Sequence, residues 1–73
     1  MIVQKEIQER LAKAILESGI KQTILANQLG IRQQQISSYI HGKTLPNLET
    51  LANLCIIIEI EPNEILGYTK KNW

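Results

Sequence analysis

Few residues in this sequence of 73 could make or break bonds. It contains one cysteine, Cys55, one histidine, His41, and no aspartate. These leave no nucleophilic triad, no metal-ligand cluster and no phosphate-binding loop. We therefore expect no enzyme, no metal and no cofactor. Cys55 falls among apolar residues and should be inert core, and His41 should contact carbonyl groups at a helix end.

The charges that could attract a ligand are unevenly distributed. The net charge is only +1, yet the interval 18–48 contains no acidic residue. Its basic residues are Lys21, Arg32 and Lys43, together with His41. Residues 49–66 reverse the pattern, with four glutamates and neither lysine nor arginine. If 18–48 forms one face of the fold, that face should attract an anionic partner.

The elements that must position these residues are predicted to be helices, which gives an all-α fold. The first covers about 4–18, because Ile7, Leu11, Ala14, Ile15 and Ser18 share one helical face. Three further helices should run over about 22–29, 33–40 and 48–58, and a short fifth over about 62–66. The expected stops are Gly19, Gly30, Gly42 and Gly67.

The fourth and fifth helices have recognisable starts. Asn47 should cap the fourth after Pro46, and Glu61 should cap the fifth before Pro62. The fourth should present a wide apolar face made of Leu48, Leu51, Ala52, Leu54, Cys55 and Ile58. A competing interpretation makes the β-branched run 56–60 a strand, although no second run could pair with it.

Length and hydropathy limit the organisation to one small domain. A chain this short buries only about 60% of its unfolded surface, and we expect a domain over 1–67 and a short tail over 68–73. Phe is absent, so the core should be aliphatic. The longest apolar run, 54–58, is far shorter than the ~20 residues of a membrane span, and the N-terminus lacks a signal-peptide pattern. We expect a soluble, cytoplasmic protein.

The second and third predicted helices are spaced as a helix-turn-helix. Two short helices joined by a turn that contains Gly define this motif. Ala26 is small where the two helices should cross closely, and Gly30 permits the tight turn. The apolar residues that should lock the pair onto the other helices are Leu25, Leu29, Ile31 and Ile36.

With these residues the chain resembles the phage repressor and Cro-type (XRE-like) helix-turn-helix family over about 4–67. The matching segments are QTILA at 22–26, LGI at 29–31, QQIS at 34–37, GK at 42–43, Pro46, LETL at 48–51 and EPNEIL at 61–66. The resemblance implies a compact five-helix bundle, the lambda repressor-like DNA-binding domain, with its third helix, about 33–41, in the DNA major groove. It also implies a dimeric transcriptional regulator, expected to be a repressor, on a palindromic operator.

The resemblance also assigns roles to individual residues. Gln33, Gln34 and Ser38 match positions that face base edges, and amide and hydroxyl groups suit that task. The expected phosphate contacts are Gln22, Arg32, Lys43 and Thr44. Arg32 departs from the family, which often has a Ser or Thr cap there, and an Arg at this position could contact either phosphate or guanine.

A second departure affects two residues together. The family often pairs a buried Arg in its first helix with a Glu near the end of its third, whereas this chain has Ile15 and Ile40 at the matching positions. Replacing a buried ion pair with packed apolar side chains is often neutral or stabilising. We therefore expect Ile15 and Ile40 to pack together in the core.

Apolar residues not assigned to the core could form the dimer surface. They are Ile56, Ile57, Ile65, Tyr68 and Trp73. A functional alternative is a protein-interaction module, such as an antitoxin or anti-repressor with the same fold. The acid-free interval favours double-stranded DNA, since a groove that binds protein does not require it.

Overall fold

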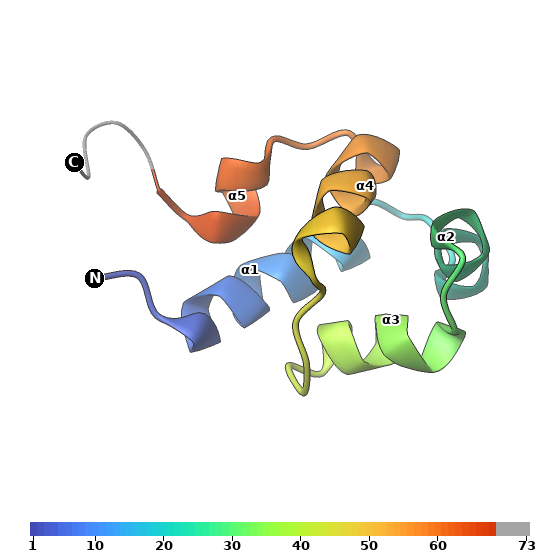
Figure 1. Cartoon of the computed structure of the whole chain (residues 1–73), viewed down its shortest axis with the longest axis horizontal. Coiled ribbons are helices and arrows are strands. Elements are labelled where there is room, and N and C mark those ends of the chain that lie inside the picture. Colours follow the sequence, from blue (N-terminus) through green and yellow to red (C-terminus); the bar gives the residue numbers. More distant parts are fainter. Residues whose placement is uncertain (69–73) are drawn as a thin grey trace.

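Five α-helices make up most of the described chain (Figure 1). In the computed structural model, which describes residues 1–68, they are α1 (Gln4–Glu17), α2 (Gln22–Leu29), α3 (Gln33–Ile40), α4 (Leu48–Ile58) and α5 (Pro62–Leu66). No strand occurs among these residues. The predicted all-α fold is therefore confirmed. The competing strand over 56–60 is wrong, because 56–58 continue α4 and the described chain offers no extended partner.

Local signals place most helix ends where the sequence predicts them. Gly30 ends α2 in the left-handed conformation, with φ 70°, which glycine adopts at little cost. Asn47 caps α4, since its Oδ1 accepts a hydrogen bond from the Thr50 N–H at 2.8 Å. Glu61 occupies the N-cap position of α5, but its side chain makes no capping hydrogen bond, so that prediction is wrong in part. Its side chain is longer than those of the residues that cap well.

Each helix contributes at least one fully buried aliphatic side chain to a single core. The six largest are Leu11, Ile15, Leu25, Ile36, Leu54 and Ile65. Full burial of one such side chain stabilises the fold by about 1.5 to 3 kcal/mol before entropy is counted. The predicted aliphatic core is confirmed.

The apolar face of α4 is narrower than predicted. Leu51, Leu54, Cys55 and Ile58 are buried, but Leu48 is 83% exposed and Ala52 is also exposed. The neighbouring helices cover only one side of α4, and 3.6-residue periodicity carries Leu48 and Ala52 around to its edge.

Ile65 was expected on the surface and lies in the core, with 0% of its area exposed. The short helix α5 packs against both α1 and α4. It therefore needs an inward-facing apolar residue, and that position falls on Ile65. Ile65 is excluded from any dimer surface.

Arg10 on α1 holds the end of α5. Its Nε donates to the Ile65 carbonyl at 2.8 Å, and its Nη2 donates to the Leu66 carbonyl at 3.0 Å. Terminal carbonyls of a helix lack partners within the helix, and a cation near them also suits the helix dipole. Glu6 lies 4.0 Å from the same guanidinium.

The main helix packings form a closed ring. The helix α1 packs against α3, α3 against α2, α2 against α4, α4 against α5, and α5 returns to α1. Figure 1 shows α1 and α5 beside each other, with α2 and α3 at the far end of the molecule. The ring leaves α3 covered by α1 and α2 on one side only.

Candidate nucleic-acid interface

The outer face of α3 is polar and uncharged. Ile36 and Tyr39 are buried, while Gln33 and Gln34 are exposed and Ser38 is half-buried. At about 100° per residue, Gln34 lies nearly opposite the buried side of the helix. In Figure 1 no other element covers the lower side of α3. The structure thus leaves the Gln33, Gln34 and Ser38 positions accessible.

The start of α2 lies beside the start of α3. Gln22 and Gln33 line one shallow hollow, together with Lys21 and with Ile15 from α1. Gln22 is half-buried and Lys21 is exposed. The hollow therefore joins two residues that the sequence assigned to phosphate and base contacts. Lys21 was identified from the sequence only as one of the basic residues of 18–48. Its position directly before Gln22, where the second helix was expected to start, could have placed it at this site.

The N-termini of α2 and α3 share an electrostatic property. Neither has an acidic residue in its first turn or a side-chain cap, and their N-cap residues are Lys21 and Arg32. The other helices each have a glutamate there: Glu6, Glu49 and Glu64. The free N–H groups and positive dipole ends of α2 and α3 are thus available to an anion.

Arg32 does not act as a side-chain cap. Its backbone N–H instead donates to Oε1 of Gln35 at 3.3 Å, and its guanidinium is left exposed. The loop after α3 adds two further exposed residues, Lys43 and Thr44. The Lys43 N–H donates to the Ser38 carbonyl at 2.9 Å, which fixes the chain direction at the end of α3.

His41 contacts the end of α3, as predicted. Its Nδ1 lies 2.8 Å from the Ser37 carbonyl oxygen and 3.3 Å from the Ser37 hydroxyl. Arg32 thus precedes α3, the exposed His41 and Lys43 follow it, and exposed glutamines lie between them. Such a surface suits a polyanion whose edges carry hydrogen-bonding groups.

A family model for the Cro/C1-type helix-turn-helix DNA-binding domain matches residues 10–71. The chain belongs to this Cro/C1-type family. The match spans α2 and α3 and the loop that carries Lys43. No curated protein and no solved structure matches the chain.

In this Cro/C1-type domain, Ile15 and Ile40 both line the hollow at the start of α2. Ile15 is 2% exposed, as expected of a core residue, but Ile40 is only half-buried and packs at the core's edge. The prediction of a core position is therefore confirmed for Ile15 and is only partly right for Ile40, since the open hollow leaves one side of Ile40 uncovered.

The residues expected to form the dimer surface of the Cro/C1-type domain differ in their exposure to solvent. Ile56 is 73% exposed, Tyr68 is 40% exposed and Ile57 is half-buried. Ile65 is core, as described above, and Trp73 lies outside the described residues. The accessible part of this surface is thus centred on Ile56, in the last turns of α4.

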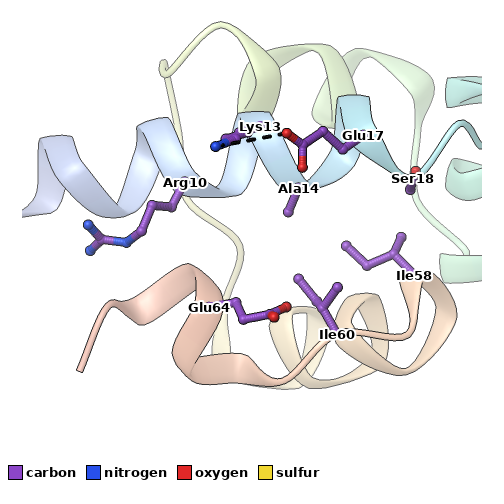
Figure 2. A pocket seen from close by; sticks show the side chains of 8 residues that line it. All are labelled: Arg10, Lys13, Ala14, Glu17, Ser18, Ile58, Ile60 and Glu64. Atoms are coloured by element: carbon purple, nitrogen blue, oxygen red, sulfur yellow. Dashed lines mark ion pairs between the residues drawn. The ribbon is translucent and has the colours of Figure 1, made fainter. Parts of the chain in front are cut away.

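A second hollow lies between α1 and the segment joining α4 to α5 (Figure 2). Lys13 and Glu17 form an ion pair of 3.9 Å on its upper wall, and Glu64 with Ile58 and Ile60 lines the opposite wall. Its walls carry charges of both signs, so it lacks the cationic character of the α2 and α3 termini. We assign it no role in nucleic-acid binding.

The remaining expectations concern metals and membranes. Within residues 1–68 no three His, Cys, Asp or Glu residues gather as metal ligands. Cys55 is buried and unpaired by disulfide, and burial, with smaller effects of Glu61 and Glu64, raises the pKa of its thiol. No helix in the described part of the chain has the length and apolar character needed to cross a bilayer.

Proposed function

We propose that this Cro/C1-type domain is a transcriptional repressor that binds a specific double-stranded DNA site, with α3 and His41 in the major groove. The observation that carries the proposal is the coincidence of two features. The only two described helices without first-turn acids, α2 and α3, start on the side where the exposed glutamines of α3 lie. Phosphates would be attracted to the helix starts while the side chains of α3 reach base edges.

Specific roles follow within that proposal. Gln34 lies at the centre of the outer face, with Gln33 and Ser38 on either side, and these three would read bases. Gln22 at the start of α2 would contact phosphate on one side of the groove. Arg32, Lys43 and Thr44 would contact phosphate around α3.

A homodimer on a palindromic operator completes the proposal. One recognition helix contacts only a few base pairs, which is too short a sequence to be unique in a genome. A second copy of the chain doubles the number of base pairs that are read. The exposed Ile56 and Tyr68, with the half-buried Ile57, would form the described part of the dimer surface. Half-sites related by two-fold symmetry should then lie about 10 to 10.5 base pairs apart.

Selection from a random duplex pool tests the proposal. We expect an enriched sequence with two-fold symmetry, and a logarithm of affinity that falls by about 0.9 per neutralised phosphate for each decade of salt. A selection without enrichment, together with binding indifferent to salt, would contradict DNA recognition. That result would favour a protein-interaction module such as an antitoxin or anti-repressor.

Two variants separate base reading from phosphate binding. Gln34→Ala should weaken the selected duplex by about 1 to 3 kcal/mol and relax the preference at one base position. Lys43→Ala should weaken selected and scrambled duplexes alike and reduce the salt slope by about 1. Gln28→Ala is the matched control, because Gln28 is exposed in the last turn of α2 and lies outside the hollow. Equal losses on both duplexes for Gln34→Ala would show that Gln34 does not read a base.

A further inference from the structure

His41 lies on the same face of α3 as the residues proposed to read bases. Gln34, Ser37, Ser38 and His41 have the i, i+3, i+4, i+7 spacing of one helical face. The His41 N–H donates to the Ser37 carbonyl at 3.0 Å, so the chain still follows the helical path at this residue. The His41 side chain is exposed. It therefore belongs to the outer face although it is not part of the expected reading set.

The contact with Ser37 engages one ring nitrogen of His41 and leaves the other available. Nδ1 lies 2.8 Å from the Ser37 carbonyl oxygen, and a carbonyl oxygen can only accept. The proton of the neutral ring therefore resides on Nδ1, where Ser37 Oγ at 3.3 Å gives a second, longer contact. Any additional proton must bind Nε2, the nitrogen not engaged by Ser37.

Protonation of Nε2 reverses its interaction with an anion. The neutral ring presents a lone pair there, which a phosphate oxygen repels, whereas the protonated ring presents an N–H donor and a positive charge. Histidine is the side chain whose charge ordinarily changes between pH 5 and 8. This chain has no second histidine, so any such change at a side chain comes from one residue.

The surroundings of His41 do not neutralise that charge in advance. The helix α3 has no charged residue, and the hollow that His41 shares with α1 is lined by one cation, Lys5, and one anion, Glu9. Lys43 follows in the chain and is exposed. The hollow beside His41 thus carries one charge of each sign, and the nearest exposed charge along the chain is the cation Lys43.

We propose that His41 is a further phosphate-binding residue whose contact forms only when Nε2 is protonated, so that the DNA complex tightens as pH falls. The proposal rests on the function proposed above. It adds a dependence on acidity that Gln33, Gln34 and Ser38 cannot supply.

Anisotropy titrations of the selected duplex at constant ionic strength test it, at about pH 8 and about pH 5.5. The wild type should bind about three- to fivefold more tightly at the lower pH for each bound chain, with a salt slope steeper by about 0.9. His41→Gln should bind equally at both. The matched control Lys43→Gln should bind more weakly at both values while retaining the pH dependence.

Two further measurements complete the test. Calorimetry of duplex binding in buffers of different ionisation enthalpy should show proton uptake by the wild type between about pH 5.5 and pH 8, and none by His41→Gln. Glu9→Gln should keep the pH dependence, since the proposed partner is phosphate and not α1.

The outcomes separate this inference from the proposed function. Specific binding with the same pH dependence in wild type and His41→Gln, or with none in either, would overturn the role of His41 and leave DNA recognition intact. A pH-dependent change in the selected base sequence would also overturn it, since His41 would then contact a base. Absence of specific binding at both pH values would instead overturn the proposed function itself.

Discussion

At the scale of single residues, the Cys55 thiol links protonation to folding. Burial raises its pKa, and the negative charges of Glu61 and Glu64 raise it further. The unfolded chain therefore loses the thiol proton at a lower pH than the folded domain does. Stability from this group is fully present below about pH 8.5 and declines as pH rises through the alkaline range.

This gives a prediction for Cys55→Ala. Urea melts of the wild type should show a loss of stability between about pH 7 and pH 10 that is larger than the loss in the variant. Tyr39, whose pKa is also raised by burial, is common to both proteins and cancels in the comparison. Parallel losses in the two proteins would show that Cys55 titrates alike in the folded and unfolded states.

The residues of the interface illustrate what the sequence could predict. The exposure of Gln33 and Gln34 follows from helical phase, because Ile36 and Tyr39 determine which side of α3 is buried. The role of Arg10 has no such signal. Its partners are the backbone carbonyls of Ile65 and Leu66, more than fifty residues away in the sequence. Every residue has a backbone carbonyl, so the side-chain pattern cannot predict these partners.

At the scale of elements, the junction between α1 and α5 is constrained by Gly67. This residue has φ 82°, and a Cβ atom added to it would overlap the Arg10 guanidinium. Gly19 has a similar φ of 72° but open space around the same position. Substitution of either glycine by alanine should therefore strain the backbone. Only at Gly67 would the new Cβ atom also overlap the Arg10 guanidinium.

We therefore predict different costs for the two alanine substitutions. Gly19→Ala should destabilise by about 1 to 2 kcal/mol, the cost of a left-handed residue with a side chain. Gly67→Ala should lose about 1 to 3 kcal/mol more, because Arg10 must leave two carbonyls without partners. Thermal or urea melts provide the comparison.

The Arg10→Ala background supplies the control for this prediction. There, Gly67→Ala should cost no more than Gly19→Ala does, because the guanidinium is gone. A cost that stays larger than that of Gly19→Ala would mean that the Arg10 contact does not explain the difference.

The ends of the helices could be predicted from the sequence better than the side of each helix that is buried. Glycines with positive φ and the Asn47 cap act locally, so Gly30 and Asn47 mark ends that the sequence alone identifies. Which side of α4 or α5 faces inward depends on neighbours. Ile65 and Leu48 were misplaced for that reason, since α5 is too short to show a period and α4 is apolar around much of its circumference.

At the scale of the whole molecule, the proposed dimer makes a prediction for Ile56. This side chain is 73% exposed, so Ile56→Glu should leave the folded domain intact while placing two like charges in the interface. Sedimentation with the selected duplex should show two chains for the wild type and reduced cooperativity for the variant. Asn53→Glu, exposed one turn earlier in α4, is the control for added charge.

The dimer prediction also has a clear contrary result. One chain on each selected duplex, at a site without two-fold symmetry, would refute the dimer and leave monomeric DNA binding in place. Unchanged cooperativity in Ile56→Glu, with two chains still bound, would place the interface elsewhere on the molecule.

The closed ring of packings affects how deletion experiments on this domain can be interpreted. In a linear stack, removing the last helix exposes one neighbour and leaves the rest assembled. Here the last helix of the described residues, α5, packs against both α1 and α4, and α1 in turn packs against α3. A truncation before Pro62 would therefore remove a packing partner of α1 and, through α1, destabilise α3, so that DNA binding is lost. A deletion series would then wrongly indicate that α5 contacts DNA.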